Sequence, residues 1–514
     1  MSLKLRKLPC QRGIAALVLG GLTTFGFAPF HMSPVPVIAG AGLFLILHNQ
    51  NPRQIFWSSF CFSLGLLLSG VYWIFISLHD YGNMHPLLAG IAVFVLCVLF
   101  ALPFGLVQCA LGNAVKATTP RLTLVFPVGV ALSDWTRDWF LTGFPWLAIG
   151  YSHVPTSPLS TYFPVFGVYG VSLASAICSG SVAYAIQKIR DSKTENIKKR
   201  SIFVGLLPGG ITMLAALLLN FSSWTQEKST APLSISMIQG NIPQDVKWSQ
   251  EWAIRTLKIY ENLIAGEGGD LVLLPETALP VFEHSVPNWF WASLSESTSK
   301  AGNEIILGLP EKDSSGRLFN SLLHIHGNER DRYQKHRLVP FGDYFPSTKL
   351  TSTLFDFFDI PMSDFSPGPT RQKPFQVGEE KIGVDICYED VFGEEIIKQL
   401  PEATILANFT NDAWWGNSIG PWQHLQIAQA RALESGRDLL RVTNTGITAH
   451  INHKGQIIKQ ADQFNRTILR SEVLGRIGST PYAIWGNYAI LVLCGSILFL
   501  CLMMASARPK NQTR

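Results

Sequence analysis

Hydrophobic positions along the chain follow two different patterns. Residues 1–221 consist mostly of long apolar runs, and a further run of this kind lies within residues 484–514. Residues 222–483 instead contain short apolar runs separated by turn residues, as in a globular domain. The pattern predicts an N-terminal transmembrane domain at 1–221, a soluble domain at 222–483, and a C-terminal transmembrane helix with a basic tail at 484–514.

Eight apolar runs are long enough, or nearly long enough, to cross a bilayer. They lie at residues 13–31, 34–48, 55–77, 86–114, 122–135, 160–187, 201–221 and 484–506. Lys and Arg residues gather before the first run, between the sixth and the seventh, and after the last. Because basic loops favour the cytoplasmic side, we expect both termini in the cytoplasm and the soluble domain on the opposite side of the membrane.

Strands and helices alternate within the soluble domain. Strands are expected at residues 234–239, 270–274, 305–307, 318–325, 381–386, 403–407 and 439–443. One helix is expected to begin after Ser249 and to end at Gly266, and a second spans residues 422–435. This alternation predicts an α/β fold with a mixed sheet.

Composition agrees with a membrane protein. Charged residues make up 15% of the chain, well below the roughly 25% of typical globular proteins, and hydrophobic residues reach 47%. The net charge of +5 comes from basic residues in short loops between apolar runs. Basic residues in such loops indicate how the chain is oriented in the membrane and do not form a surface that binds phosphate groups. We therefore expect no nucleic-acid partner.

Three polar residues at or after predicted strands carry the candidate chemistry. Cys387 follows the strand at 381–386 and is the only cysteine within the soluble domain, Glu276 follows Leu-Val-Leu-Leu-Pro, and Lys335 precedes His-Arg-Leu-Val-Pro-Phe-Gly. A thiol needs a base to become nucleophilic, and an acyl carbonyl under attack needs a positive donor for its oxyanion. Each residue taken alone also fits a structural role, such as a buried free cysteine.

The segments that hold these residues resemble a known superfamily. Leu-Pro-Glu-Thr, Lys-His-Arg-Leu-Val-Pro-Phe-Gly and Asp-Ile-Cys-Tyr-Glu-Asp are similar to the three motifs of the nitrilase superfamily. Within it, the apolar N-terminal half, Gln-Gly-Asn-Ile-Pro-Gln from residue 239 and Asn-Asp-Ala-Trp-Trp-Gly from residue 411 resemble the bacterial apolipoprotein N-acyltransferase family. The resemblance implies an α-β-β-α sandwich inserted in a bundle of about eight transmembrane helices.

The resemblance also implies roles for single residues. Glu276 matches the general base, Lys335 the oxyanion stabiliser and Cys387 the nucleophile of the family's triad. Four further residues match supporting positions: Trp248, Asp343, Tyr388 and Glu389. Asp343 departs from the family pattern, which usually has Glu there, so its carboxylate is one methylene closer to the backbone.

The function implied by the resemblance is acyl transfer at a membrane. An acyl chain would pass from a phospholipid, through a cysteine thioester, to the α-amino group of the lipid-modified N-terminal cysteine of an apolipoprotein. No cofactor or metal is expected. The implied location is the bacterial inner membrane, with the catalytic domain in the periplasm.

Several alternatives are weaker. A membrane-anchored nitrilase-type amidohydrolase would pass the acyl group to water. A Cys-His hydrolase would use His336 or His424, but neither lies in a motif with an orienting Asn or Asp. A zinc enzyme would need His-Glu-x-x-His or paired cysteines, which the sequence lacks. A transporter or receptor with an inactive triad would be expected to carry damaged motifs, and these three are intact.

One further segment suggests a contact with lipid. Aromatic residues crowd into the turn-rich stretch at 344–369. We expect either a mobile arm that guides an acyl chain toward Cys387 or a hydrophobic plug under the sheet.

Overall fold

Two compact units make up the chain in the computed structural model, which describes residues 9–115, 120–191, 195–228, 231–327, 329–344 and 364–506. The first unit is helical and combines Met1–Tyr72, Gly90–Ser222 and Trp485–Arg514. The second combines Trp73–Ala89 with Ser223–Ile484 and contains every strand that the structure describes.

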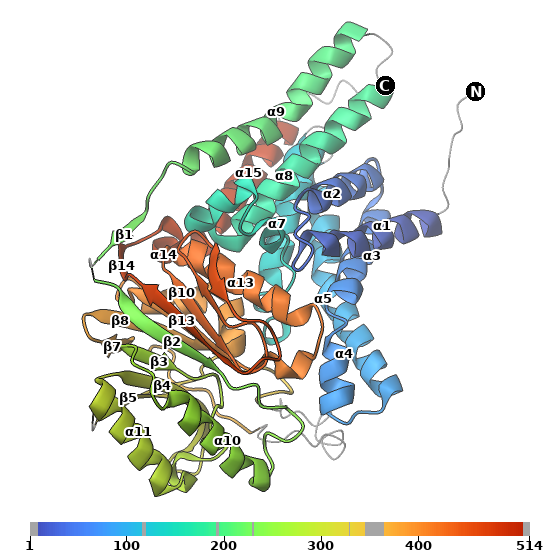
Figure 1. Ribbon diagram of the computed structural model, residues 1–514. Coiled ribbons are helices and arrows are strands. Elements are labelled where there is room, and N and C mark those ends of the chain that lie inside the picture. Colours follow the sequence, from blue (N-terminus) through green and yellow to red (C-terminus); the bar gives the residue numbers. More distant parts are fainter. Residues whose placement is uncertain are drawn as a thin grey trace. The chain divides into compact units, whose positions relative to one another are not determined.

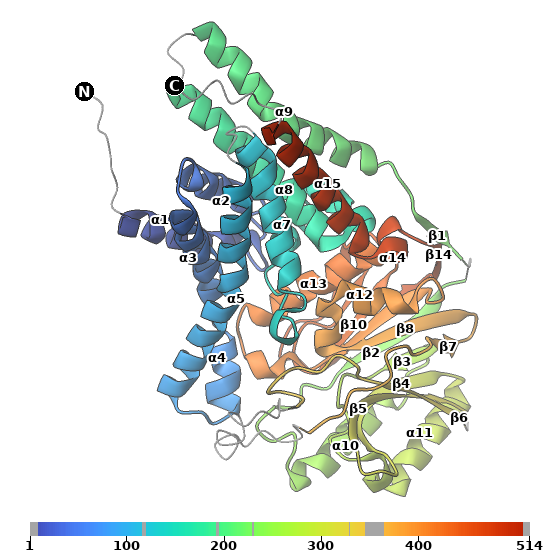
Figure 2. The same cartoon turned by 180° about the vertical axis from the view of Figure 1, so that it is seen from behind.

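The helical unit is built from apolar helices of different lengths (Figure 2). They are α1 (Pro9–Thr23), α2 (Pro34–Leu47), α3 (Pro52–Gly70), α5 (Pro86–Ala114), α7 (Phe126–Thr136), α8 (Phe163–Asp191), α9 (Glu195–Leu219) and α15 (Tyr488–Ser506). Short helical turns connect them: η1 (Thr24–Gly26), η3 (Arg121–Val125), η4 (Phe140–Thr142), η5 (Ile149–His153) and η6 (Pro158–Tyr162). Helix α8 packs against α2, α7 and α9, and α1 packs against α3.

Four helices in the described part of the chain are long and apolar enough to cross a membrane. They are Pro86–Ala114, Pro158–Asp191, Ile202–Leu219 and Tyr488–Ser506. The bent pair Pro52–Gly70 and Ile74–Tyr81 would make a fifth. Helices α2 and α7 have 14 and 11 residues, fewer than the roughly 20 that a span needs. The prediction of eight spans is therefore not confirmed among the described residues.

The run predicted to span the membrane at 55–77 is not one straight helix. Helix α3 ends at Gly70, and Ile74–Tyr81 continues at an angle of 58° to it. The second piece comprises α4 (Ile74–Ile76) and the π-helical turn η2 (Ser77–Tyr81). It belongs to the globular unit because Trp73 stacks on Trp415, with ring centroids 4.7 Å apart. Hydropathy alone predicts that residues 55–77 cross the membrane as one span.

Two six-stranded sheets form the frame of the globular unit. The first has the order β13 (Thr467–Val473), β2 (Leu233–Gln239), β3 (Leu271–Leu273), β4 (Glu304–Lys312), β5 (Leu318–His326), β6 (Glu329–Gln334). The second has the order β12 (Ile457–Gln460), β11 (Ala449–Ile451), β10 (Leu439–Thr443), β9 (Ile405–Thr410), β8 (Glu380–Ile386), β7 (Phe375–Val377). In each sheet three neighbouring strands are parallel and the others antiparallel, so both are mixed, as predicted.

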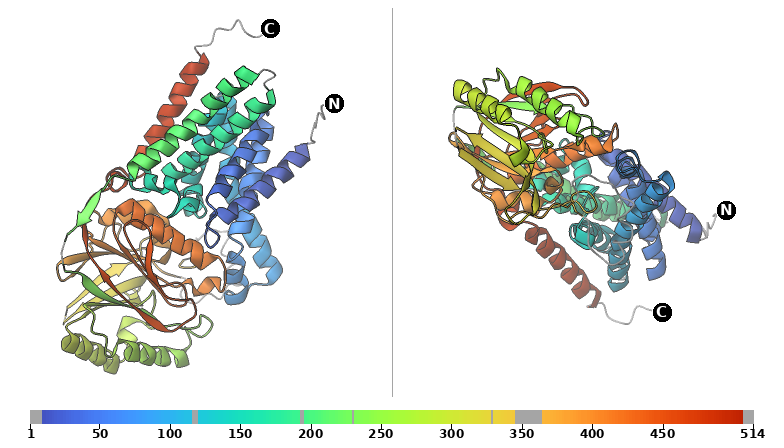
Figure 3. Two further views of the ribbon diagram at one scale, coloured as in Figure 1. Left: turned by 45° about the horizontal axis from the view of Figure 1, so that its top comes forward. Right: turned by 90° about the horizontal axis from the view of Figure 1, so that it is seen from below.

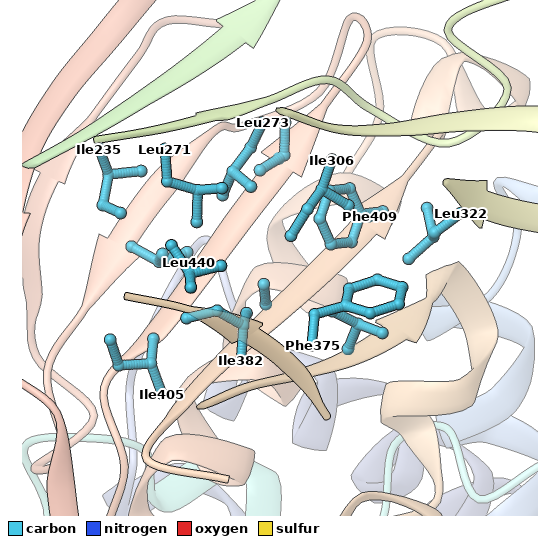
Figure 4. Close-up of a cluster of buried hydrophobic side chains, with 14 of the residues drawn as sticks. Ile235, Leu271, Leu273, Ile306, Leu322, Phe375, Ile382, Ile405, Phe409 and Leu440 are labelled. Carbon is cyan, nitrogen blue, oxygen red and sulfur yellow. The ribbon is translucent and has the colours of Figure 1, made fainter. Parts of the chain in front are cut away.

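The two sheets bury their facing sides against each other. Leu273 and Ile306 of the first sheet and Ile382 and Leu440 of the second belong to one cluster of almost fully buried side chains (Figure 4). Alternation along each strand directs every second side chain into this cluster. The apolar positions that alternate along the strands in the sequence are therefore the side chains that fill the space between the two sheets.

Helices cover the outer faces of the sandwich (Figures 1 and 3). Helices α10 (Gln250–Ile264) and α11 (Asn288–Ala301) pack on the first sheet. Helices α12 (Gly393–Ile396) and α13 (Gly420–Ser435) pack on the second. The result is the expected α-β-β-α arrangement.

Smaller elements complete the globular unit. The 3-10 turns are η7 (Glu283–Ser285), η9 (Cys387–Val391), η10 (Ile397–Gln399) and η11 (Asp412–Trp415), and α14 (Pro481–Trp485) follows the last strand. The first and last strands of this unit lie side by side, because β1 (Thr225–Glu227) pairs antiparallel with β14 (Arg476–Gly478).

Most predicted elements of this unit are confirmed. Ser249 caps α10 by accepting a hydrogen bond from the Trp252 amide, as its position before the first turn indicated. The strand predicted at 403–407 differs, since it begins at Ile405 and continues to Thr410.

Candidate active site

The three motif residues follow three different strands and meet in one place. Glu276 follows β3, Lys335 follows β6, and Cys387 follows β8 in the facing sheet. The Lys335 ammonium lies 3.3 Å from the Glu276 carboxylate, and both groups act electrostatically on the Cys387 thiol. Strands β3 and β6 run in the same direction within their sheet, so their carboxyl ends bring Glu276 and Lys335 to the same edge.

The backbone at Cys387 turns sharply. Its φ is 53°, in the left-handed region that non-glycine residues rarely adopt. The Cys387 carbonyl accepts a hydrogen bond from the Asn408 amide at 3.3 Å and lies 3.3 Å from His424 Nε2. These contacts hold the strained turn, which presents the half-buried thiol at the end of β8.

Cys387 is a thiol at neutral pH. Burial raises its pKa well above the usual value, and the Glu276 and Asp412 carboxylates raise it further, while Lys335 and a hydrogen bond with Thr410 oppose the shift. A base must therefore remove its proton before or during attack on a carbonyl. The Glu276 carboxylate lies in the same site and is the candidate base.

Lys335 is held between two carboxylates. Its ammonium lies 2.7 Å from Asp343 Oδ2 and 3.3 Å from Glu276 Oε1, and only 1% of its surface is exposed. Burial opposes its charge, but Asp343 and Glu276 outweigh that cost and raise the Lys335 pKa. The shorter side chain of Asp343 therefore still reaches the lysine, and its position is fixed by a hydrogen bond from the Val339 amide.

A tight turn positions Glu276. Its Oε1 accepts a hydrogen bond from Asn320 Nδ2 at 2.8 Å. The next residue, Thr277, has a φ of 46°, which is rare for a β-branched residue. The turn crosses β4 closely at Gly308, where a Cβ atom would lie 2.5 Å from the Thr277 nitrogen. Gly308 is required there because no side chain fits.

A second buried lysine supports the same turn. Lys247 Nζ donates to the Thr277 hydroxyl at 2.6 Å and to the Glu276 carbonyl at 3.4 Å. Among the described residues it forms no ion pair with a carboxylate. Burial lowers its pKa to about 8, while Glu276 and Cys387 oppose the shift. Lys247 is thus a cation that contacts the backbone of the candidate base. No motif in the sequence marks Lys247, although it adjoins Trp248.

Glu389 links the cysteine turn to the lysine loop. One carboxylate oxygen accepts from the backbone amides of His336 and Arg337, and the other accepts from the Ile386 amide and the Tyr333 hydroxyl. Burial raises the Glu389 pKa to about 7, against the effect of the backbone amides. The Glu389 side chain thereby links the end of β6 to the end of β8.

Two further predicted residues lie beside this framework. Tyr388 is buried and packs edge-to-face on Phe392. Trp248 is half-buried, and its indole Nε1 is a buried donor that has no hydrogen-bond partner among the described residues. A donor of this kind suits a substrate oxygen.

A buried charge network lies behind the cysteine turn. His424 contacts Asp412 at 2.8 Å and Asp390 at 2.9 Å, and Arg441 contacts both carboxylates. His424 Nε2 also lies 3.3 Å from the carbonyl oxygen of Cys387. His336 instead lies 2.9 Å from Glu395. Both histidines thus face carboxylate groups.

Of the aromatic segment at 344–369, predicted to be either a mobile arm or a hydrophobic plug, the structure describes the two ends. Residues 345–363 lie outside the described residues. The two ends of the segment meet next to the site. The backbones of Tyr344 and Asp364 form an antiparallel β-bridge, and the backbone amide of Phe365 donates a hydrogen bond to the Asp343 carbonyl.

Comparison with known proteins places this architecture in a family. Residues 19–181 match the family model "Apolipoprotein N-acyltransferase N-terminal domain", and residues 234–482 match "Carbon-nitrogen hydrolase". The apolipoprotein N-acyltransferase of Nitrosomonas europaea is 40% identical over 493 residues, which cover 95% of this chain and 96% of the relative. This chain belongs to the apolipoprotein N-acyltransferase family.

A second relative is similar over nearly the whole chain, and one solved structure over about half of it. The apolipoprotein N-acyltransferase of Methylococcus capsulatus is 35% identical and matches 95% of each chain. The crystal structure of a carbon-nitrogen hydrolase from Helicobacter pylori G27 is 16% identical, with a TM-score of 0.35, and covers 54% of this chain and 96% of that one. Within the family the chain is an acyltransferase with a catalytic domain of the carbon-nitrogen hydrolase type.

We expect the substitution Lys247→Met to lower the rate of acyl transfer by about 10- to 100-fold, because hydrogen bonds from a charged group contribute about 1.5–3 kcal/mol. The Lys247 pKa of about 8 also predicts a fall in wild-type rate as pH rises through that value and the ammonium loses its charge. This decrease in rate with rising pH should be absent in K247M.

The control is Lys258→Met, which removes an exposed lysine paired with Glu261 on α10. K258M should keep the wild-type rate and profile. A K247M enzyme with an unchanged rate and an unchanged pH profile would show that Lys247 does not act on the site.

Proposed function

We propose that this acyltransferase moves an acyl chain from a phospholipid, through a thioester on Cys387, to the α-amino group of the lipid-modified N-terminal cysteine of an apolipoprotein. One observation carries the proposal: a buried ammonium and a buried carboxylate, 3.3 Å apart, lie in one site with a cysteine whose backbone is strained at a strand end. These are the groups that nucleophilic acyl transfer requires.

In the first half-reaction Cys387 attacks the ester carbonyl of the phospholipid. Glu276 takes the thiol proton as the carbon–sulfur bond forms, and the Lys335 ammonium stabilises the oxyanion. The bond to the glycerol oxygen then breaks, and Glu276 returns the proton to the departing lysophospholipid. The enzyme is left with a thioester and with Glu276 again ionised.

In the second half-reaction the apolipoprotein amine attacks the thioester. Glu276 takes a proton from the amine, and Lys335 stabilises the second oxyanion. The carbon–sulfur bond breaks, an amide remains on the acceptor, and the proton passes from Glu276 to the cysteine sulfur. Because both substrates use one site in turn, the kinetics should be ping-pong.

The remaining predicted residues support these steps. Asp343 keeps Lys335 charged and in place, and Glu389 ties the lysine loop to the cysteine turn. The free indole donor of Trp248 would bind an oxygen of the substrate. Tyr388, the residue after Cys387, packs edge-to-face on Phe392. Exclusion of water from this site would protect the thioester from hydrolysis.

The family membership and the apolar helices make this a bacterial membrane protein that acts on lipoproteins. Beyond that, we propose about eight spans in the inner membrane, both termini in the cytoplasm and a periplasmic catalytic domain at 222–483, flanked by membrane parts at 1–221 and 484–514. The distribution of Lys and Arg along the chain supports this orientation.

We expect the enzyme to acquire a label when it is incubated with acyl-labelled phospholipid alone. The label should be sensitive to hydroxylamine, as a thioester is, and mass spectrometry should locate it on Cys387. Added apolipoprotein should remove the label from the enzyme and receive it as an amide. Cys387→Ala should abolish labelling, whereas Cys61→Ala, in helix α3 and outside the site, should not change it.

The competing amidohydrolase gives a different result in the same experiment. A hydrolase would release free fatty acid continuously and would retain no label in the absence of acceptor. That outcome would exclude the transferase mechanism.

The substitution Lys335→Met should lower the rate of enzyme acylation by at least about 10²- to 10³-fold, as when an oxyanion donor is removed, while phospholipid binding changes little. It also leaves two buried carboxylates without their cation, so thermal stability should fall. The double variant K335M/D343N removes one of these charges. It should regain stability but not activity, and recovery of both would mean that Lys335 is only structural.

A topology reporter fused after Asn220 or before Tyr482 should lie on the opposite side of the membrane from one fused after Arg514. The basic loops motivate this expectation. Labelling of all three fusions from the same side would contradict the proposed orientation.

A further inference from the structure

Two histidines and a carboxylate form a cluster on the β5–β6 hairpin, separate from the active-site residues, and a second carboxylate, Glu304, adjoins it from β4. His324 and His326 are two positions apart on β5, so both side chains lie on the same face of the sheet. Asp331 on β6 is the cross-strand partner of His324. One ligating atom from each of these three residues lies within 4.8 Å of the other two.

The buried histidine has one nitrogen with a partner and one without. His324 is fully buried, and its Nε2 lies 2.6 Å from Glu304 Oε2. Its Nδ1 is also buried but makes no hydrogen bond with any described residue, and it lies 3.8 Å from Asp331 Oδ2. If Glu304 accepts the Nε2 proton, the lone pair of Nδ1 is left directed toward Asp331. Histidines that bind metals are oriented by a carboxylate in this way.

The spacing of the three atoms suits a small tetrahedral ion. His326 Nε2 lies 3.1 Å from Asp331 Oδ2, and His324 Nδ1 lies 3.8 Å from the same oxygen. Bonds of about 2.0–2.1 Å in tetrahedral geometry separate neighbouring ligand atoms by roughly 3.3 Å. The two nitrogen–oxygen separations lie within about half an ångström of this value, and the separation between the two histidine nitrogens is at most 4.8 Å.

Charge also favours a shared cation over separate histidine–carboxylate pairs. The two imidazole rings stack with centroids 4.7 Å apart. Two protonated rings at this distance would repel each other, whereas two neutral rings can bind one divalent ion together. Asp331 is 60% exposed and His326 is partly exposed, so an ion and a water molecule can reach the cluster from solvent.

We propose that His324 Nδ1, His326 Nε2 and Asp331 Oδ2 bind one divalent transition-metal ion, with Zn²⁺ the best match to two imidazoles and a carboxylate. Glu304 orients His324, and water completes the coordination. The ion joins β5 to β6, the strand that leads directly into Lys335. It fastens the hairpin and takes no part in the chemistry at Cys387.

The test uses the purified full-length protein, stripped with a chelator and then dialysed against Zn²⁺ alone. Wild-type protein should retain about one Zn²⁺ per chain more than the double variant H326Q/D331N, and its melting temperature should rise with Zn²⁺. With Co²⁺ as the probe, wild-type protein should show the visible absorption of a tetrahedral nitrogen–oxygen site, which the variant lacks. Both substituted positions are partly exposed, so the variant should fold.

The matched control is His453→Gln, which changes a partly exposed histidine that faces Asp438 elsewhere in the unit. H453Q should bind metal as the wild type does. Equal Zn²⁺ content in the wild type and in H326Q/D331N would overturn the proposal, whether that content is zero or reflects a site elsewhere. A loss of binding in H453Q as large as in the double variant would also overturn it.

Discussion

A lysine ammonium buried between two carboxylates is the interaction on which the proposed active site depends. Lys335 Nζ lies 2.7 Å from Asp343 and 3.3 Å from Glu276, and all three residues are at least nine-tenths buried. Withdrawing an ion from water costs several kcal/mol, so the charge is tolerated only where its partners are held in place. The sandwich provides this because Glu276 and Lys335 follow strands of one sheet that end at the same edge.

Strained backbone at two points completes the site, and the surrounding contacts maintain it. Cys387 and Thr277 both have positive φ values, which cost of order 1–3 kcal/mol each. Lys247 and the closely packed Gly308 hold the turn after Glu276. The side-chain amide of Asn408 donates a hydrogen bond to the carbonyl of Cys387. Rigid placement of a base and a nucleophile before substrate arrives reduces the reorganisation that the reaction requires.

The first side chain of the segment Trp73–Ala89 is buried against the globular unit. Trp73 donates a hydrogen bond to Gln423 and stacks on Trp415, whose ring packs in turn against His424. His424 contacts the carbonyl of Cys387. This segment of the N-terminal half is therefore connected, through two side chains, to the backbone of the proposed nucleophile.

The sequence by itself determined the α/β class, most strands of the sandwich and the three residues of the proposed triad, because strand periodicity and local motifs are properties of neighbouring residues. The contacts of Asn320 and Lys247 with the Glu276 turn, and the pairing of His324 with Asp331, were decided only by the tertiary structure. Their partners lie on other strands and loops, and no spacing in the chain encodes which buried polar atoms will meet. Hydropathy likewise measured the apolar character of residues 55–77 correctly but could not say whether lipid or protein would cover it.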